Sequence, residues 1–104
     1  MICISSKNEC SIRFTDERIK HISENHPETK ECILWIVETI EEPNIILEGE
    51  YGELIALRFY SKTPVSANKY LAVVYKEMAN IDGFVITAYF CTKYNNSRKV
   101  IWKH

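Results

Sequence analysis

Two histidines near the start of the chain, His21 and His26, are the side chains whose type and spacing best suit chemistry. Histidine is the side chain whose unperturbed pKa lies between pH 5 and 8. Two histidines held close together can supply a general base and a general acid without a metal ion. Both lie in the run TDERIKHISENHP, which is typical of a short helix that begins at a Thr15 or Asp16 cap and ends before Pro27.

The spacing of the two histidines separates them on a regular helix, but a break in the helix could bring them together. Five residues along an α-helix amount to about 140° of rotation, at 3.6 residues per turn, so a regular helix would not place both side chains on one side. Pro27 disfavours helical geometry at His26, and this break could bring His26 round to the site. Alternatively, His26 simply caps the following helix.

The rest of the chain predicts the elements that would hold these histidines. Apolar residues recur with the helical period after Pro27, which predicts a second helix from about Glu28 to Glu42, stopped by Pro43. Beyond Pro43 the period changes from 3.6 to 2.0 residues, which predicts strands. The expected strands, including one before the first helix, cover residues 10–15, 44–48, 53–60, 70–76, 84–92 and 99–102, with Asp82 and Gly83 in a connection. The sequence thus predicts a single α+β domain over residues 1–104, with two N-terminal helices packed on one face of a four- or five-stranded antiparallel sheet.

Alternation along the expected strands divides their side chains between two faces of the sheet. Apolar side chains are assigned to the face under the helices: Ile55, Leu57, Phe59, Phe84, Ile86, Ala88 and Phe90. The opposite face gathers basic, phenolic and hydroxyl side chains: Arg58, Tyr60, Lys76, Thr87 and Tyr89, with Thr92 or Lys93 at its rim. Such a face can hydrogen-bond phosphate oxygens and stack bases. Solvent-facing strand positions favour polar residues anyway, so the cluster argues for a site more strongly than its single members do.

Charge is divided unevenly along the chain, although its net value is only −1. Residues 1–52 contain five Lys or Arg and eleven Asp or Glu, a net charge of −6. Residues 53–104 contain eight Lys or Arg and three Asp or Glu, a net charge of +5. The split favours a polyanionic partner for one surface and permits a short RNA substrate. It argues against extensive DNA binding, which would need a more basic chain.

Composition and cysteine spacing exclude several classes of protein. With 46% hydrophobic and 26% charged residues, the chain can bury a core and is not expected to be disordered. No segment approaches the roughly 18 apolar residues of a membrane span, and the N-terminus lacks the pattern of a secretory signal, so we expect a cytoplasmic protein without a membrane partner. We favour buried, reduced thiols over a zinc site built from Cys3, Cys10, His21 and His26, and we expect no metal and no cofactor.

These residue types suit the cleavage of RNA by its own 2′-hydroxyl group. That reaction needs a base for the 2′-hydroxyl proton, an acid for the leaving 5′-oxygen, and cations that stabilise the charged phosphorane. His21 and His26 suit the two proton transfers. The other roles fall to the sheet face: Arg58 and Lys76 for charge stabilisation, and Tyr89, Tyr60 or Thr87 for phosphate orientation.

Three stretches of the sequence, taken together, resemble a known superfamily. They are TDERIKHI with a following HPE, then YLAVVYK, and finally FVITAYFCTK before a closing VIW. Over about residues 10–103 the chain resembles small prokaryotic and phage proteins of the barnase–EndoU–colicin–RelE-like ribonuclease superfamily. The resemblance implies metal-independent RNA cleavage on the open face of an antiparallel sheet, often by a toxin that an antitoxin restrains. It extends to these matching positions: His21, His26, Lys76, Thr87, Tyr89 and Thr92.

Two other classes of function fit the same sequence. The fold could be a catalytically silent module that binds RNA or a protein, which burial of the histidines far from Arg58 and Lys76 would favour. It could also be an assembly protein that pairs through edge strands near Trp102. The main prediction is a metal-independent endoribonuclease, toxin-like or associated with a mobile element, with RNA and an antitoxin as partners and the oligomeric state left open.

Overall fold

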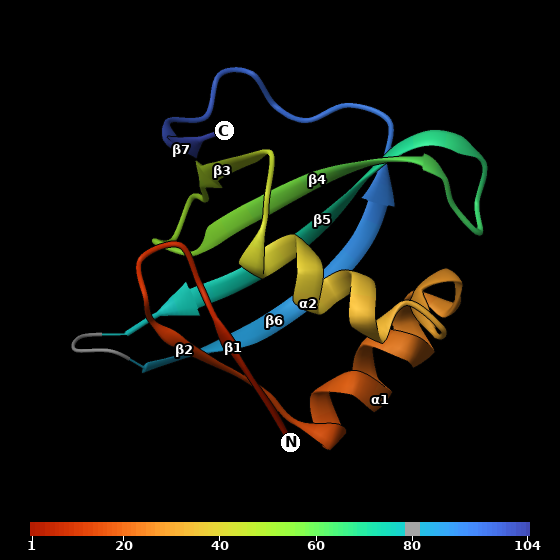
Figure 1. Ribbon diagram of the computed structural model, residues 1–104, viewed down its shortest axis with the longest axis horizontal. Coiled ribbons are helices and arrows are strands. Elements are labelled where there is room, and N and C mark those ends of the chain that lie inside the picture. Colours follow the sequence, from red (N-terminus) through yellow and green to blue (C-terminus); the bar gives the residue numbers. More distant parts are fainter. Residues whose placement is uncertain (79–81) are drawn as a thin grey trace.

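The computed structural model, which describes residues 1–78 and 82–104, folds two helices against a mixed, mostly antiparallel sheet of seven strands (Figure 1). The elements in chain order are β1 (Ile2–Ser5), β2 (Ser11–Phe14), α1 (Asp16–Asn25), the 3-10 turn η1 (Pro27–Thr29), α2 (Ile33–Glu41), β3 (Ile45–Glu48), β4 (Leu54–Lys62), β5 (Ala67–Glu77), β6 (Asp82–Cys91) and β7 (Val100–Lys103). The strands lie in the order β1-β2-β6-β5-β4-β3-β7, so β1 and β7 form the two edges.

The α+β class is confirmed, but the predicted four or five strands and the purely antiparallel pairing are wrong. The sheet gains β1, a four-residue strand that is too short for its alternation to stand out in the sequence. The strand predicted at residues 10–15 is present as β2, but it pairs antiparallel with β1 and parallel with β6, a parallel pairing that the sequence did not predict. Asp82 and Gly83, predicted in a connection, lie within β6 because they pair with β2. The strand that precedes the helices therefore belongs to the same sheet as the strands that follow them.

Helix α1 begins and ends where its sequence predicts. The Thr15 hydroxyl accepts a hydrogen bond from the backbone N–H of Arg18 at 3.1 Å, which caps the first turn. At the other end the helix stops at Asn25, before Pro27. The predicted second helix is divided, because Pro27 opens the separate turn η1 and α2 follows only from Ile33.

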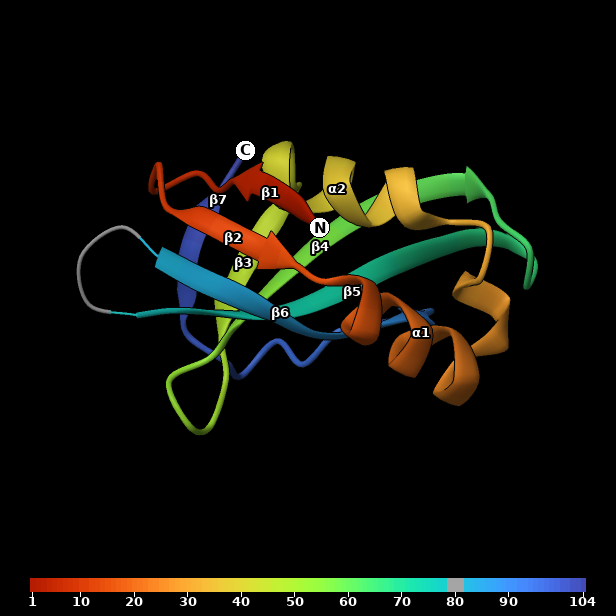
Figure 2. The same cartoon turned by 90° about the horizontal axis from the view of Figure 1, so that it is seen from below.

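The two helices cover different parts of the sheet (Figure 2). Helix α2 lies across one face, whereas α1 runs beside β6, the strand that it contacts. Among the described residues, β2 pairs with β6 over Asp82–Phe84, and no described strand lies beside the rest of that edge of β6. There the guanidinium of Arg18 donates to the carbonyl of Ile86 at 3.3 Å, which satisfies a backbone acceptor at the edge.

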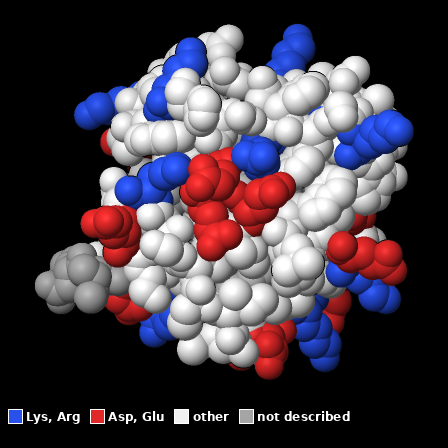
Figure 3. Space-filling view, viewed as in Figure 1, with Lys and Arg blue, Asp and Glu red and all other residues white. Residues whose placement is uncertain are grey.

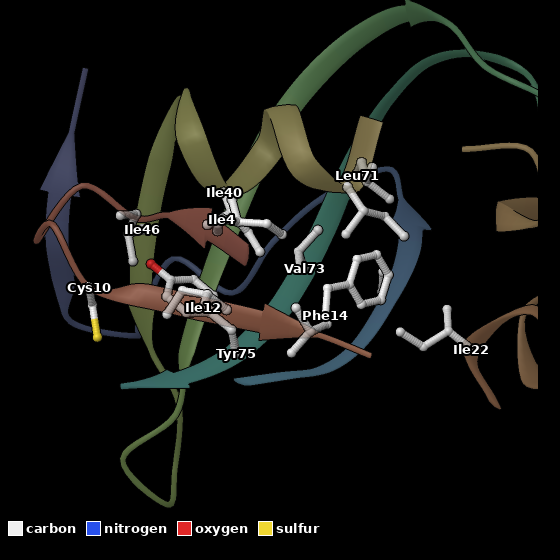
Figure 4. Close-up of a cluster of buried hydrophobic side chains, with 14 residues drawn as sticks. Ile4, Cys10, Ile12, Phe14, Ile22, Ile40, Ile46, Leu71, Val73 and Tyr75 are labelled. Atoms are coloured by element: carbon white, nitrogen blue, oxygen red, sulfur yellow. The ribbon is translucent and has the colours of Figure 1, made fainter. Parts of the chain in front are cut away.

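A buried apolar cluster lies between α2, β1, β2 and the central strands (Figure 4). Phe14 and Tyr75 are its largest members, and neither has any exposed surface. Ile22 of α1 and Ile40 of α2 are buried in the same cluster. The helices are therefore held to the sheet mainly by apolar burial, at about 25 cal/mol per Å² of surface removed from water.

A second, smaller apolar cluster lies on the opposite face of the sheet, which we call the open face. Its buried members are Ile45, Leu47, Leu57 and Ala72. Tyr94, from the segment that links β6 to β7, packs against it. The central strands thus carry apolar side chains on both faces, and on the open face Tyr94 covers part of them.

The predicted faces of β4 are reversed. Arg58 and Tyr60, expected on the open face, lie under α2, where Arg58 Nε is 3.2 Å from Glu38 Oε1. Tyr60 donates to the same oxygen at 2.6 Å, and its ring stacks on Trp35 with centroids 4.5 Å apart. Leu57 faces the second cluster instead. Alternation separates the two sets of side chains correctly, but with an apolar cluster on each face it does not say which set meets the helix.

A β-bulge in β6 corrects a second prediction. Val74 is opposite Thr87, but Tyr75 is opposite Val85, so Ile86 is an extra residue in β6. On one side of the bulge Val85 is buried and Phe84 is exposed, contrary to the prediction for Phe84. On the other side the predicted alternation holds, with the side chain of Ala88 in the core and that of Tyr89 on the open face.

We expect the Tyr60 hydroxyl to contribute to the free energy of unfolding of the protein. Tyr60→Phe removes the hydrogen bond to Glu38 and is expected to lower the free energy of unfolding by about 0.5–1.5 kcal/mol at neutral pH. Burial, followed by the hydrogen bond to Glu38, raises the pKa of Tyr60 to about 12. A raised pKa in the folded state means stability that is present below the unfolded value, near 10, and is lost as pH rises toward 12.

The measurement is urea unfolding of both proteins at neutral pH and at several pH values between about 9 and 11. The unfolding free energy of the wild type should fall more steeply with pH than that of Tyr60→Phe. Tyr75 and Tyr89, whose pKa values are also raised by burial, remain in both proteins and contribute equally to both slopes. Equal slopes for the two proteins would contradict the assignment of the alkaline loss to Tyr60.

Candidate functional site

The break between α1 and η1 brings His26 beside Tyr89. The backbone N–H of His26 donates to the carbonyl of Ile22 at 2.7 Å, which closes the last turn of α1. The buried Thr29 hydroxyl donates to the His26 carbonyl at 2.7 Å, which fixes the start of the next turn. The ring centroids of His26 and Tyr89 are 6.0 Å apart. The chain turn that Pro27 imposes therefore places an imidazole next to a phenol of the open face.

The surroundings of His26 suit proton transfer through one ring nitrogen. Nδ1 lies 3.7 Å from a carboxylate oxygen of Glu28, and the side chain is 36% exposed. A carboxylate at Nδ1 favours a proton on that nitrogen, which leaves Nε2 to accept another. The imidazole is therefore reachable from solvent and lies near a carboxylate.

His21 has different surroundings, so the expected pair of histidines does not form one site. Its Nε2 is 3.0 Å from the side-chain nitrogen of Asn25, one helical turn further along α1. It lines a shallow, open hollow that is formed by α1 and its cap: Thr15, Glu17, Arg18, Lys20, His21 and Glu24. The rotation of five residues along the helix separates the two side chains, and the break changes only the position of His26.

Tyr89 also lines a pocket of about 180 Å³ on the open face. The apolar residues of this pocket come from β3 and β4: Leu47, Ile55 and Leu57. Its remaining residues come from β6 and from the segment after it: Tyr89, Cys91, Lys93, Tyr94, Asn95 and Arg98. Among the residues that the structure describes, the two charged members of this lining, Lys93 and Arg98, are both basic.

Hydrogen bonds within the segment 92–99 hold these basic residues over the sheet. Asn95 Oδ1 accepts from the Ser97 backbone N–H at 2.9 Å and from its hydroxyl at 2.6 Å. The Arg98 backbone N–H donates to the Asn95 carbonyl at 3.2 Å. The Arg98 guanidinium lies 3.8 Å from a Glu50 carboxylate oxygen, so its charge is partly balanced while Lys93 remains exposed.

The protonation states of the pocket follow from burial. Burial raises the pKa of the Tyr89 hydroxyl above its ordinary value, so the phenol stays protonated near neutral pH and can donate a hydrogen bond. Burial likewise raises the pKa of the Cys91 thiol, which disfavours the nucleophilic thiolate. Cys91 thus suits packing, whereas Tyr89 offers a protonated hydroxyl next to His26.

The structure places the other predicted site residues at different distances from this pair. Thr87 lies on the open face, two positions from Tyr89 in β6. Lys76 follows the buried Tyr75, so alternation puts it on the open face too. It is four residues along β5 from the register partner of Tyr89, or about 13 Å at the usual strand rise.

Thr92 and the β4 residues lie away from the site. Thr92 accepts a hydrogen bond from Lys69, the register partner of Tyr60, so this contact lies toward the face under α2. Arg58 and Tyr60 lie under α2 itself. The structure thus brings His26 beside Tyr89 and places Lys93 in the pocket that Tyr89 lines, with Thr87 two positions from Tyr89 on the same face. It leaves Lys76 further along the open face and separates Arg58, Tyr60, Thr92 and His21 from this site.

Arg98 and Tyr94 are the site residues that the sequence analysis missed. Both belong to the irregular segment between β6 and β7, where no strand alternation assigns a side chain to a face. The run Asn95-Asn96-Ser97 is typical of a turn, and basic residues lie on both sides of it, at Lys93 and Arg98. This pattern is the sequence signal that could have indicated the segment.

Neither a metal site nor a membrane-spanning helix is found in the described part of the chain. Within residues 1–78 and 82–104, no three His, Cys, Asp or Glu side chains are grouped so as to hold a metal ion. None of the described helices is long and apolar enough to cross a membrane. Comparison with family models, with curated proteins and with solved structures finds no match for this chain.

Proposed function

We propose that the protein is a metal-independent endoribonuclease whose active centre lies on the open face at His26 and Tyr89. The observation that carries this proposal is the 6.0 Å separation of the two rings at the edge of a pocket that Lys93 and Arg98 also line. A base, a proton donor and two cations are the groups that cyclising cleavage of RNA needs. Membership of the barnase–EndoU–colicin–RelE-like superfamily, which the sequence resembles, is part of the same proposal.

The proposed reaction uses the chain's own side chains. His26 Nε2 accepts the proton of the 2′-hydroxyl, whose oxygen attacks the adjacent phosphorus. The bond from phosphorus to the 5′-oxygen breaks, and the Tyr89 hydroxyl gives that oxygen a proton. The proton on His26 then returns to the Tyr89 phenolate, so the side chains end as they began. Lys93 and Arg98 stabilise the charge on the phosphorane. The products are a 2′,3′-cyclic phosphate and a 5′-hydroxyl end.

The distribution of charge supports the open face as the RNA side. Figure 3 shows the side of the molecule that carries α2, where acidic side chains gather at the centre. Exposed glutamates on α2 and at its end include Glu38, Glu41 and Glu42. Arg58 and Lys7 pair with two of them, at 3.2 Å from Glu38 and 3.2 Å from Glu42. A polyanion is repelled by the acidic side chains of this side and attracted by the cations at the pocket.

The deciding experiment is incubation of the pure protein with end-labelled RNA in EDTA. We expect cleavage to persist in EDTA and to leave 2′,3′-cyclic phosphate ends, because attack by the 2′-hydroxyl needs no metal. The same oligonucleotide with 2′-O-methyl groups lacks the nucleophile and should remain intact. The proposal is wrong if EDTA abolishes an activity that magnesium or zinc restores, or if the 2′-O-methyl oligonucleotide is also cut.

A catalytically silent RNA-binding module is the second candidate function. The observation that favours it is the reversed β4, because Arg58 is not available to the open face and only one histidine lies there. This candidate predicts that RNA is bound by the open face and recovered intact under every metal condition. An antitoxin protein as partner and a cytoplasmic location belong to the endoribonuclease proposal alone. Such an antitoxin would cover the open face and compete with RNA.

A further inference from the structure

The lining of the open-face pocket has the chemistry of a site for a flat, apolar ring. Leu47 and Leu57 are buried side chains of its lining. Tyr89 and Tyr94 are its aromatic members, and both are partly exposed. A ring that entered would contact aliphatic side chains and a phenol, the combination that receives unstacked nucleobases in single-stranded RNA.

Tyr94 is held in place by a row of aromatic contacts. Its ring meets Tyr70 edge to face, with centroids 5.3 Å apart and planes at 85°. Tyr70 in turn meets Phe59 edge to face, with centroids 5.4 Å apart. The edge-to-face geometry is a favoured arrangement of aromatic pairs, so the position of the Tyr94 ring is set before any ligand arrives. A preorganised ring loses little freedom on binding.

The basic residues of the same pocket suit the phosphate that a nucleotide carries. Lys93 and Arg98 belong to the segment that also supplies Tyr94. Two acids lie near these residues: Glu50, which is 3.8 Å from Arg98, and Glu53, whose carboxylate interacts with the charge of Arg98. A base against Tyr94 and a phosphate at Lys93 and Arg98 would lie in the same pocket that Tyr89 lines.

We propose that this pocket binds one unpaired nucleobase of the RNA, stacked against Tyr94, with the attached phosphate at Lys93 and Arg98. The inference rests on the proposed function, because it gives that active centre its substrate preference. A base can enter only when it is free of its partner strand, so the substrate is single-stranded RNA rather than a duplex.

The test measures binding of a short 2′-O-methyl RNA oligonucleotide, which has bases and phosphates but cannot be cleaved by 2′-hydroxyl attack. Tyr94→Ala and Tyr94→Leu should weaken binding by about 5- to 150-fold, the range for loss of one base–aromatic stack. Tyr94→Phe keeps the ring and should bind as the wild type does. Tyr51→Ala is the matched control, because Tyr51 lies in the β3–β4 turn and is 82% exposed. The leucine variant keeps apolar volume against the second cluster, so it preserves the test if the alanine variant fails to fold.

Two further measurements complete the test. Pairing the oligonucleotide with its complement should remove most of the affinity for the wild type. Arg98→Gln should weaken binding at low salt and reduce the salt dependence of the affinity, because one phosphate contact is lost. Equal affinity for duplex and single strand, or full binding by Tyr94→Leu, would overturn the inference.

The outcomes separate this inference from the proposed function. If the wild type cleaves RNA and Tyr94→Leu binds the 2′-O-methyl oligonucleotide fully, the base pocket is wrong and the endoribonuclease stands. If the oligonucleotide binds through Tyr94 but RNA is never cut, the pocket is right and the protein is the silent binding module. If the wild type neither binds nor cuts, both proposals fail.

Discussion

His26→Ala is expected to lower the rate of RNA cleavage by about 10²- to 10⁴-fold, the usual contribution of one acid–base group. The imidazole is partly exposed and, in the proposed reaction, supplies the Nε2 that accepts the 2′-hydroxyl proton, whereas the contacts that shape this turn use the His26 backbone. The variant should therefore fold as the wild type does. Initial rates on a labelled single-stranded RNA, with circular dichroism as a check of folding, measure both quantities.

His21→Ala is the matched control for this result. It removes the same side chain from the same helix, but at a position that contacts Asn25 and lines the hollow on α1. Its cleavage rate should equal that of the wild type. The pH profile gives a second readout, because the wild-type rate should fall in acid, where a protonated imidazole accepts no proton, and His26→Ala should lack that limb. Loss of activity in His21→Ala but not in His26→Ala would move the active centre to the outer side of α1.

Phe14→Ala is expected to lower the free energy of unfolding by about 3–5 kcal/mol, since it removes a large ring from a close-packed interior and leaves a cavity. Phe14 has no exposed surface and belongs to the cluster that joins β2 to Ile22 of α1 and to Val73 of β5. This loss is a large part of the stability of an ordinary domain, which is about 5–15 kcal/mol. Urea unfolding followed by circular dichroism gives the change in midpoint.

Phe84→Ala is the control for Phe14→Ala, because it removes the same ring from the neighbouring strand β6. Phe84 is opposite Arg13, the residue before Phe14, but it is 36% exposed because it lies on the Val85 side of the bulge. Its removal should cost about 1 kcal/mol or less, as for substitutions near the surface. Comparable losses for the two variants would contradict the placement of the bulge at Ile86.

Local signals in the sequence predicted the helices and the central strands well. Thr15 and Pro27 bound α1 because a cap and a proline act through the few residues next to them. β5 contains the predicted segment 70–76, which is dense in β-branched and aromatic residues. The position of His26 at the helix end followed from the same local rule, although its neighbour Tyr89 lies 63 positions away in the sequence.

Features that depend on contacts between distant parts of the chain were not predictable from local signals. The two sets of β4 side chains that contain Arg58 and Leu57 were separated correctly, but the choice of face depends on which apolar cluster α2 covers. Arg98 reaches the site from an irregular segment, where no periodic pattern links sequence to direction. The parallel pairing of β2 with β6 joins residues about 70 positions apart, and alternation does not encode a partner.

The bulge at Ile86 reverses the alternation of side chains between the two faces of β6. If the alternation that buries Val85 continued without interruption, positions 87, 89 and 91 would face the core, and the single extra residue turns them to the open face. The location of the Tyr89 phenol beside His26 therefore depends on how many residues separate it from Val85, as well as on which residue stands at position 89. A substitution at Tyr89 can change its chemistry, but the loss or gain of one residue at the bulge would exchange the two faces of the strand beyond it. The number of residues in β6 therefore decides which face its second half presents to His26.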